Sequence, residues 1–484
     1  MKRWISCLIA LSILCFIGCP TAEQKPQPRI DGEDSSPAEG QPEVDGQSAA
    51  AAPDDKTTIE TILGGDLALA ETVLQAESTD EVSEYVATII ENRELAEIAI
   101  RVKQLGGAFD FDDAGTLVGI NLHECSTTDA DIEKISTLGN LKTLILWGAE
   151  ITNEGVKHVD KLHKLTELTL MNTEMDDDGL RQLTDLPDLV NLNLQRTTNM
   201  TNDGLKFVAD TFPNLQYLHV LYNNITDEGV AHLKGLSKLK LLDLRGCDVS
   251  DNGLADLKDL PSLKSLKLRS YAVSDAGMEY VKEMTKLTSL GLEDSGVGDP
   301  GLLLLTDLPL EDFNVFRCYG VTDAGLAALE GFKDLKILSV RDTPINGSGL
   351  VHLKGATHLK KLDLSETLVN DAALAHLKGL AELEWLNLWH SDITDAGLDN
   401  LTGLKALKTL NLEGNYLTDA ALAHIEKLEG LESLKLKENP LTDAAVEHLK
   451  KLTNLKSLDI SLTQIGSDAA DELAEALPDC KIVH

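Results

Sequence analysis

Residues 383–398 read LEWLNLWHSDITDAGL, and this stretch holds both halves of a unit that recurs along most of the chain. Leu386 and Leu388 alternate with polar or outward-facing residues as in a strand, and the part after Thr394 has apolar residues at helical spacing. The unit LxxLxLxx(T/N/C)xI-T-D-x-G-L-x-x-L-x-x-L is usually 24 residues long. We number fourteen units by their first leucine, namely Leu141, Leu165, Leu189, Leu215, Leu239, Leu263, Leu287, Leu310, Leu335, Leu359, Leu383, Leu407, Leu431 and Leu455, after a weaker unit at 117–140.

One strand and one helix cannot bury an apolar face alone, so neighbouring units must stack on a shared core. This pattern resembles the ribonuclease-inhibitor-like and F-box-type leucine-rich repeats, whose convex side is helical. The T-D-A-G-L phrase also resembles repeat proteins of planctomycete-type bacteria. The resemblance implies an α/β, right-handed leucine-rich-repeat solenoid with a concave parallel sheet, convex helices and a role in protein binding.

The start of each helix is marked by a Thr-Asp pair. Thr322, Thr394, Thr418 and Thr442 suit the N-cap, and the aspartate that follows each of them suits the positive end of the helix dipole. A calcium ladder on these aspartates is the alternative, but the loop lacks the alternating oxygen ligands of such sites. We therefore interpret the aspartate as a device for starting the helix.

The N-terminal segment has the pattern of an exported protein. Residues 1–19 combine Lys2 and Arg3 with an apolar run too short for a bilayer span, as in a signal peptide. Residues 16–19 (FIGC) resemble the bacterial lipobox, which implies lipidation of Cys19; the alternative is cleavage after Ala22. We expect a lipid-anchored protein that faces the periplasm or the cell surface.

Four further segments follow the signal peptide. Residues 20–56 are acidic, rich in proline and alanine, and predict a disordered tether. Residues 57–115 predict a helical N-terminal cap that ends in the start of a hairpin, with an Asp-Asp-Ala-Gly turn. The repeat array then occupies 116–475, and 476–484 predict a C-terminal capping strand. Nothing in the pattern requires an oligomer, and a monomer is favoured.

Composition and motifs argue against several functions. A formal charge of −37 argues against a nucleic-acid binder, which needs dense Lys and Arg. No nucleophile elbow, phosphate loop or HExxH motif indicates an enzyme, and no cofactor is expected. Histidines that recur on the predicted helices lack a third metal ligand. Cys125, Cys247 and Cys318 are predicted to be core thiols, because Cys247 and Cys318 lie about 14 Å apart at strand spacing.

The concave face is where unusual residues gather. Five of the six arginines that follow Leu141 occupy outward positions of the strand or its exit, namely Arg196, Arg245, Arg269, Arg317 and Arg341. Arginine and large aromatics are enriched at binding hot spots. The predicted ligand-binding residues are Trp147, Tyr217, His219, Tyr222, Arg245, Arg269, Phe316, Arg317, Arg341, Trp385, Asn387, Trp389 and His390.

Several interpretations of this face remain open. The arginines could form an ion-pair ladder with Glu293 and Asp294 rather than a binding surface. Trp385 and Trp389 could stack on sugars, with Asn387 bonding hydroxyl groups, in an envelope carbohydrate-binding protein. A structural envelope protein without a specific ligand is the third possibility. The sequence favours a non-enzymatic protein that binds a protein partner on its concave face.

Overall fold

The computed structural model describes residues 84–484, with side chains from Glu94 onward. The predicted signal peptide, the tether, Cys19 and the part of the cap before Glu84 therefore lie outside the described residues. No helix between residues 84 and 484 combines the length and apolar character that a bilayer span needs.

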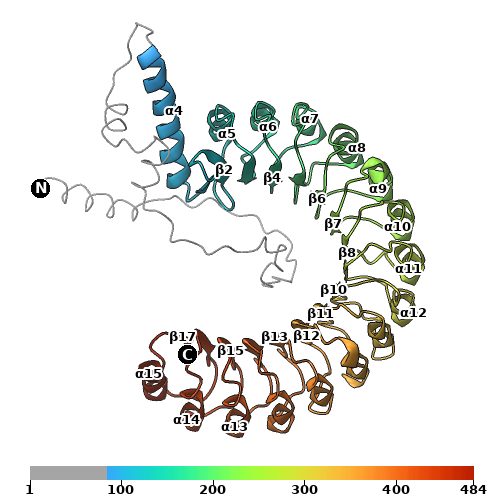
Figure 1. Ribbon diagram of the computed structural model, residues 1–484, viewed down its shortest axis with the longest axis vertical. Helices are drawn as coiled ribbons and strands as arrows, with labels where there is room; N and C mark the ends of the chain where they lie inside the picture. Colours follow the sequence, from blue (N-terminus) through green and yellow to red (C-terminus); the bar gives the residue numbers. More distant parts are fainter. Residues whose placement is uncertain (1–83) are drawn as a thin grey trace, which may run out of the picture. The chain divides into compact units, whose positions relative to one another are not determined.

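Short strands and short helices alternate along the described chain (Figure 1). The strands are β1 (Ala108–Phe111), β2 (Leu117–Asn121), β3 (Thr143–Trp147), β4 (Glu167–Met171), β5 (Asn191–Asn193), β6 (Tyr217–His219), β7 (Leu241–Arg245), β8 (Ser265–Arg269), β9 (Ser289–Glu293), β10 (Asp312–Asn314), β11 (Ile337–Ser339), β12 (Lys361–Asp363), β13 (Trp385–Asn387), β14 (Thr409–Asn411), β15 (Ser433–Lys435), β16 (Ser457–Asp459) and β17 (Lys481–Val483). The α-helices are α4 (Glu84–Gln104), α5 (Asp129–Ile135), α6 (Asn153–Val159), α7 (Asp177–Leu180), α8 (Asn202–Thr211), α9 (Asp227–Ala231), α10 (Asp251–Leu257), α11 (Asp275–Val281), α12 (Asp299–Leu303), α13 (Leu422–Ile425), α14 (Val446–Leu449) and α15 (Ser467–Ala476).

Parts of the convex side, mainly in the second half of the array, consist of 3₁₀ turns rather than the expected α-helices. These runs are three to eight residues long, and the longest exceed the three or four residues that are usual for this tighter form. They are η1 (His232–Gly235), η2 (Gly325–Glu330), η3 (Ser348–Gly355), η4 (Ala373–Leu377), η5 (Asp395–Leu401), η6 (Asp419–Ala421) and η7 (Asp443–Ala445).

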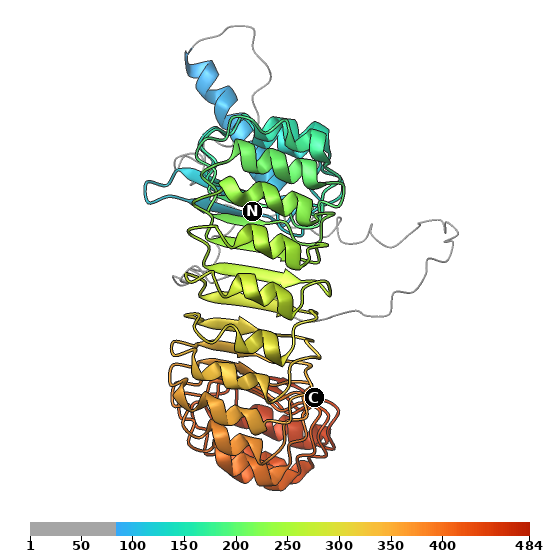
Figure 2. The same ribbon diagram turned by 90° about the vertical axis from the view of Figure 1, so that its right-hand side faces the viewer.

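The strands form one sheet in chain order. β1 pairs with β2 antiparallel, and each strand from β2 to β17 pairs in parallel with the next. The register joins equivalent positions of successive units, for example Leu386 with Leu410. Strands line the inner side of the curved array and helices its outer side (Figures 1 and 2). The predicted α/β solenoid with a concave parallel sheet is confirmed.

The buried face of each unit supplies one continuous core. The residues at the first, fourth and sixth positions, mostly leucine, are buried in every unit, as Leu383, Leu386 and Leu388 are in unit eleven. Cys125, Cys247 and Cys318 are buried free thiols, as predicted, and burial raises the pKa of both Cys247 and Cys318 to about 11.

The end of the strand is set by the fifth residue of the unit. In many units this residue is Asn or Asp, and its side chain accepts a hydrogen bond from the N–H two residues later, as Asn387 does from Trp389. The chain then turns at the eighth residue, which is left-handed in nearly every unit, with φ of +58° at Tyr222 and Arg317 and +48° at His390. This turn places the side chains of the seventh and eighth residues along the edge of the sheet where the strands end.

A ladder of aspartates links successive units. Asp395 accepts hydrogen bonds from the N–H (2.8 Å) and the hydroxyl (2.5 Å) of Thr418, the N-cap of the next unit. Asn202 also makes two bonds to Thr226: its amide oxygen accepts from the N–H of Thr226, and its amide nitrogen donates to the hydroxyl. Both bonds also join Asp129 to Thr152, Asp177 to Thr201, Asp227 to Ser250, Asp251 to Ser274, Asp299 to Thr322, Asp371 to Thr394 and Asp419 to Thr442.

The aspartate is therefore more than the helix-starting device expected from the sequence, because it also clamps the following unit. The glycine of each T-D-x-G phrase leaves room for this carboxylate: a Cβ on Gly277 would lie 2.4 Å from Asp251 Oδ1. Among units one to thirteen, only unit nine has neither Asp nor Asn at this position, which Gly347 occupies. No carboxylate of unit nine reaches Asn370, the equivalent of Thr418 in unit ten.

We expect Asp251→Ala to destabilise the array by about 2–4 kcal/mol, because two charge-assisted hydrogen bonds to Ser274 are lost. Asp251→Asn should cost less than half as much, since Asn202 shows that an amide can make both bonds. Urea unfolding followed by circular dichroism measures the difference. Equal losses for the two variants would show that the carboxylate charge matters more than the bonds.

Candidate functional site

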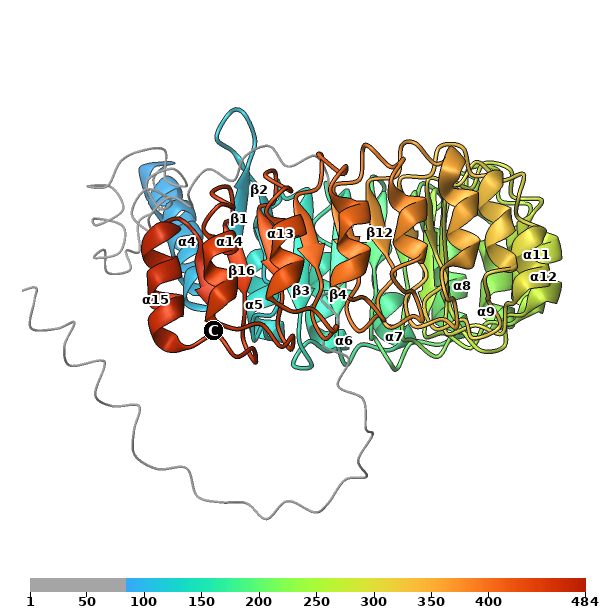
Figure 3. The same cartoon turned by 90° about the horizontal axis from the view of Figure 1, so that it is seen from below.

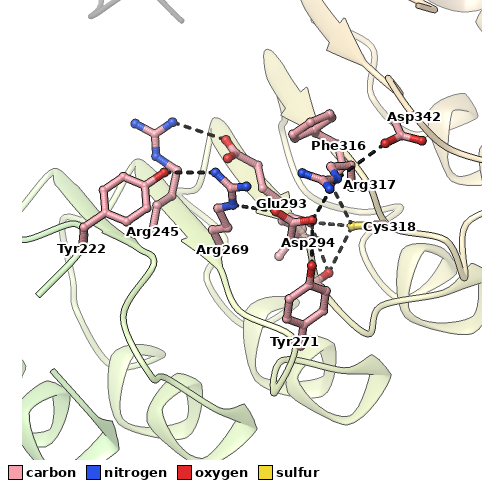
Figure 4. Close-up of polar contacts among 12 residues, drawn as sticks. Tyr222, Arg245, Arg269, Tyr271, Glu293, Asp294, Phe316, Arg317, Cys318 and Asp342 are labelled. Atoms are coloured by element: carbon pink, nitrogen blue, oxygen red, sulfur yellow. Dashed lines mark hydrogen bonds and ion pairs between the residues drawn. The ribbon is translucent and has the colours of Figure 1, made fainter. Parts of the chain in front are cut away.

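The seventh and eighth residues of the units form a connected line of side chains, which we call the rim seam. At its centre Asp294, almost fully buried, lies between two arginines (Figure 4). Arg269 Nε donates to Asp294 Oδ2 at 2.5 Å, and Arg317 Nε lies 3.3 Å from Asp294 Oδ1. Arg269 also donates to the hydroxyl of Tyr222 at 3.0 Å, two units earlier. One carboxylate thus organises side chains from four units.

A second buried pair lies beside this centre. Arg245 donates to both carboxylate oxygens of Asp243 at 3.1 and 2.9 Å, and its Nη1 is 3.4 Å from Glu293 Oε1. Burial alone would raise the pKa of Asp243, but the hydrogen bonds and the charge of Arg245, together with the nearby His219 ring, hold this pKa well below its ordinary value. For Arg245 burial lowers the pKa, and the bonds to Asp243 more than offset this effect. Both groups are therefore charged at neutral pH.

Beyond Arg317 the rim seam continues through aromatic rings. The guanidinium of Arg341 lies 4.9 Å from the ring centre of Phe316 and 5.3 Å from that of Trp389, so it is sandwiched between them. Arg341 Nε also donates to Glu366 at 2.8 Å. Trp389 in turn packs edge-on against His390, with 5.0 Å between ring centres. The stack spans units eight to eleven.

Where the eighth residue of a unit is glycine, the aromatic or imidazole ring of the preceding unit lies over that glycine. A Cβ on Gly246 would lie 2.3 Å from the ring of Tyr222, and one on Gly414 would lie 2.8 Å from His390. The guanidinium of Arg196 also stacks on the Tyr222 ring, 5.0 Å from the ring centre. The rim seam therefore runs without a break from unit three to unit eleven, and both glycines are needed for ring contact.

Two family models match the sequence, both described as leucine-rich repeat. One matches residues 381–441, and the other matches residues 213–233, 235–258 and 451–474. These matches fall on the strand–helix units whose stacking is described above. The fold is a leucine-rich-repeat solenoid.

Solved structures agree on the fold. An internalin (inlF) from Listeria monocytogenes is 24% identical, with a TM-score of 0.51 over 68% of this chain and 93% of the internalin chain. A structure of the Rad7 and Elc1 complex in yeast gives 17% identity and a TM-score of 0.50, over 84% of this chain and 98% of the matched chain. No curated protein matches the sequence.

Most predicted site residues of this leucine-rich-repeat solenoid contact one another. The structure brings together Tyr222, Arg245, Arg269, Phe316, Arg317, Arg341, Trp389 and His390 through the rim seam and Glu293. His219 lies 3.9 Å from Asp243, and the side chain of Asn387 accepts a hydrogen bond from the N–H of Trp389 at the end of the strand. The half-buried Trp147, Tyr217 and Trp385 make no side-chain hydrogen bond, ion pair or ring contact with any described residue.

The ion-pair interpretation describes the geometry of four of the five arginines on this face. Arg196 is exposed and, within residues 84–484, has no carboxylate partner. The sequence reasoning missed the partner acids Asp243, Asp342 and Glu366. They could have been identified by their positions, because each is an acid at the fifth or eighth position of a unit that carries one of these arginines or adjoins such a unit. The same described residues hold no cluster of three or more His, Cys, Asp or Glu side chains placed to bind a metal ion.

Asp363, at the fifth position of unit ten, should be a pH-dependent weak point. Burial raises its pKa, although it accepts hydrogen bonds from the N–H and hydroxyl of Ser365. A raised folded-state pKa means that the charged form costs stability, and this cost appears as pH rises through that pKa. Asp363→Asn should raise the unfolding temperature at pH 7 and lose this advantage below about pH 3.5, where the carboxyl is protonated. A constant difference from pH 3 to 7 in thermal scans would contradict this.

Proposed function

We propose that this protein is a non-enzymatic recognition protein that binds another protein on its concave face and is held at a membrane by lipidated Cys19. The observation that carries the proposal is the rim seam, in which arginine and aromatic side chains are already fixed before a partner arrives. Ordering such side chains on binding costs about 0.5–1.5 kcal/mol each, so fixing them beforehand favours affinity. A leucine-rich-repeat solenoid is also suited to presenting an extended concave surface.

The side chains without internal partners indicate how contact would be made. Trp385 on β13 and Trp147 on β3 lie ten units apart, or about 50 Å at strand spacing, which only a large partner can span. The shared carboxylates neutralise the central arginines, so capture of a free anion is not their role. Arg196, stacked on Tyr222 but unpaired among the described residues, is the arginine best placed to bond a partner's carboxylate or carbonyl group.

Site-specific photo-crosslinking in the native cell tests the concave-face proposal. A crosslinking residue at position 385 should capture one defined protein, whereas the same residue at position 375, in η4 on the convex side, should not. With that protein purified, Trp385→Ala and Arg196→Ala should each weaken binding about tenfold or more, the effect expected for a hot-spot residue. Identical products from both positions would contradict the proposal, and capture of polysaccharide alone would favour the carbohydrate-binding alternative.

The membrane anchor needs a separate measurement, because Cys19 lies outside the described residues. Radiolabelled palmitate should be incorporated into the wild-type chain and not into Cys19→Ala. Equal labelling of the two chains would remove the anchor from the proposal without affecting the concave face.

A further inference from the structure

The loops between strands and helices in the second half of the array carry exposed apolar side chains. We define the exit edge as residues 317–323, 342–347, 366–371, 390–395, 414–419 and 438–443, one segment from each of units eight to thirteen. Strands and helices run between this lateral edge and the opposite one, and loops form both edges (Figure 3). Tyr319, Leu368 and Tyr416 on the exit edge are 59%, 56% and 67% exposed.

Folding does not require apolar residues at these positions. The three side chains occupy the tenth position of units eight, ten and twelve. The first five units have polar residues at the same position, namely Glu150, Glu174, Thr198, Asn224 and Asp248. The backbone N–H at this position donates to a carbonyl group of the preceding unit in both halves of the array. Leu368 and Tyr416 make this bond in the second half, and Glu174 and Asp248 make it in the first. Exposed apolar groups that the fold does not need are typical of interaction surfaces.

The exit edge is also strongly acidic. Its six segments contain nine Asp or Glu residues, one arginine and no lysine. The arginine, Arg317, is already paired with Asp294 and Asp342. Two basic residues outside the segments, Arg341 and Lys437, pair with Glu366 and Glu438. The other six of the nine acids form no ion pair with a described residue. Ladder aspartates such as Asp395 and Asp419 accept hydrogen bonds from N–H and hydroxyl groups, which satisfy their oxygens but leave their negative charge in place. A partner for this edge must therefore supply positive charge.

We propose that the exit edge is a second docking surface, which binds a cationic amphipathic helix of a partner protein. Tyr319, Leu368 and Tyr416 recur every second unit, about 10 Å apart at strand spacing. Two turns of an α-helix span about 11 Å, so one helix can place an apolar residue on each anchor with a spacing of seven residues. Lysines on its flanks then face the aspartates. A second copy of this chain is a poorer occupant, because a net charge of −37 repels copies from one another.

The test uses the purified chain and a synthetic peptide of about 18 residues, with leucine along one helical face and lysine elsewhere. Calorimetry should detect binding that weakens as salt is raised. The triple variant Tyr319→Thr, Leu368→Asn, Tyr416→Asn introduces uncharged residues that earlier units carry at the same position, and it should bind at least tenfold more weakly. The control Glu150→Ser, Glu174→Ser changes that position in the first half and should leave affinity within about twofold, as expected for distant sites.

Two further arms separate the possible outcomes. A peptide with serine in place of leucine should bind the wild-type chain no better than it binds the triple variant. Equal affinity of the leucine peptide for wild type and triple variant would overturn the proposal, and so would self-association of the wild-type chain that the triple variant abolishes in sedimentation. Trp385→Ala should not change peptide affinity, so this surface and the concave face can fail independently.

Discussion

Replacing Gly331 by alanine should destabilise the array by about 3 kcal/mol or more, because the new methyl group would meet the backbone of the preceding unit. The added Cβ would lie 1.8 Å from the carbonyl oxygen and 2.7 Å from the carbonyl carbon of Thr306. The cause is visible in the sequence: the step from Leu287 to Leu310 is 23 residues, one fewer than usual. The shortened loop draws Thr306 close to unit eight, where only glycine fits.

The chain provides a matched control for this prediction. Gly379 and Gly403 occupy the same position in later units, and a Cβ on either would meet nothing within 4 Å. Gly379→Ala should therefore be neutral or stabilise by about 0.4–1 kcal/mol, through loss of freedom in the unfolded chain. Urea unfolding of both variants gives the comparison. If Gly331→Ala were as stable as Gly379→Ala, the close approach to Thr306 would be wrong.

Phe313→Ala should cost about 3–5 kcal/mol, the usual price of emptying a buried aromatic site. Phe313 is fully buried on β10, and its ring meets that of Phe332 edge-on, with 5.4 Å between centres. Other units carry leucine at the position of Phe313, for example Leu290 and Leu338 in the adjoining strands. Phe313→Leu should therefore lose less than half as much stability.

Stability in a stacked array is partly local, so the readout should be local as well. Amide exchange in β9, β10 and β11 should speed up in Phe313→Ala, while exchange in β3 and β4 should remain near the wild-type rate. Uniform loss of protection along the whole array would instead indicate that the fourteen units unfold as one block.

The period of the sequence made the fold predictable. Leu383, Leu386 and Leu388 recur with equivalents in each unit, so strand register, core and concave face all follow from one short pattern. The 3₁₀ form of η2 to η7 did not follow, because the apolar spacing of so short a helix does not distinguish it from an α-helix. The aspartate ladder was missed for a different reason. The Thr-Asp pair was read within one unit, whereas the bond joins Asp395 to Thr418 of the next.

The candidate site was predictable in position but not in connectivity. Arg269 and Arg341 were placed on the concave side from their positions in the unit. Their partners depend on curvature and side-chain conformation, which carry no sequence period. Arg269 reaches back 47 residues to Tyr222, and Arg341 stacks on Trp389 two units ahead. Whether these residues bind a ligand stays a prediction.

The interruption of the aspartate ladder at Gly347 has a mechanical consequence. Under tension along the array, units nine and ten meet at a joint that lacks the clamp present at most other junctions. The stack of Phe316, Arg341 and Trp389 connects units eight, nine and eleven and therefore holds the two sides of this joint together. We therefore expect units nine and ten to separate first when the molecule is stretched. A partner that binds and fixes the stack should make the whole array stiffer.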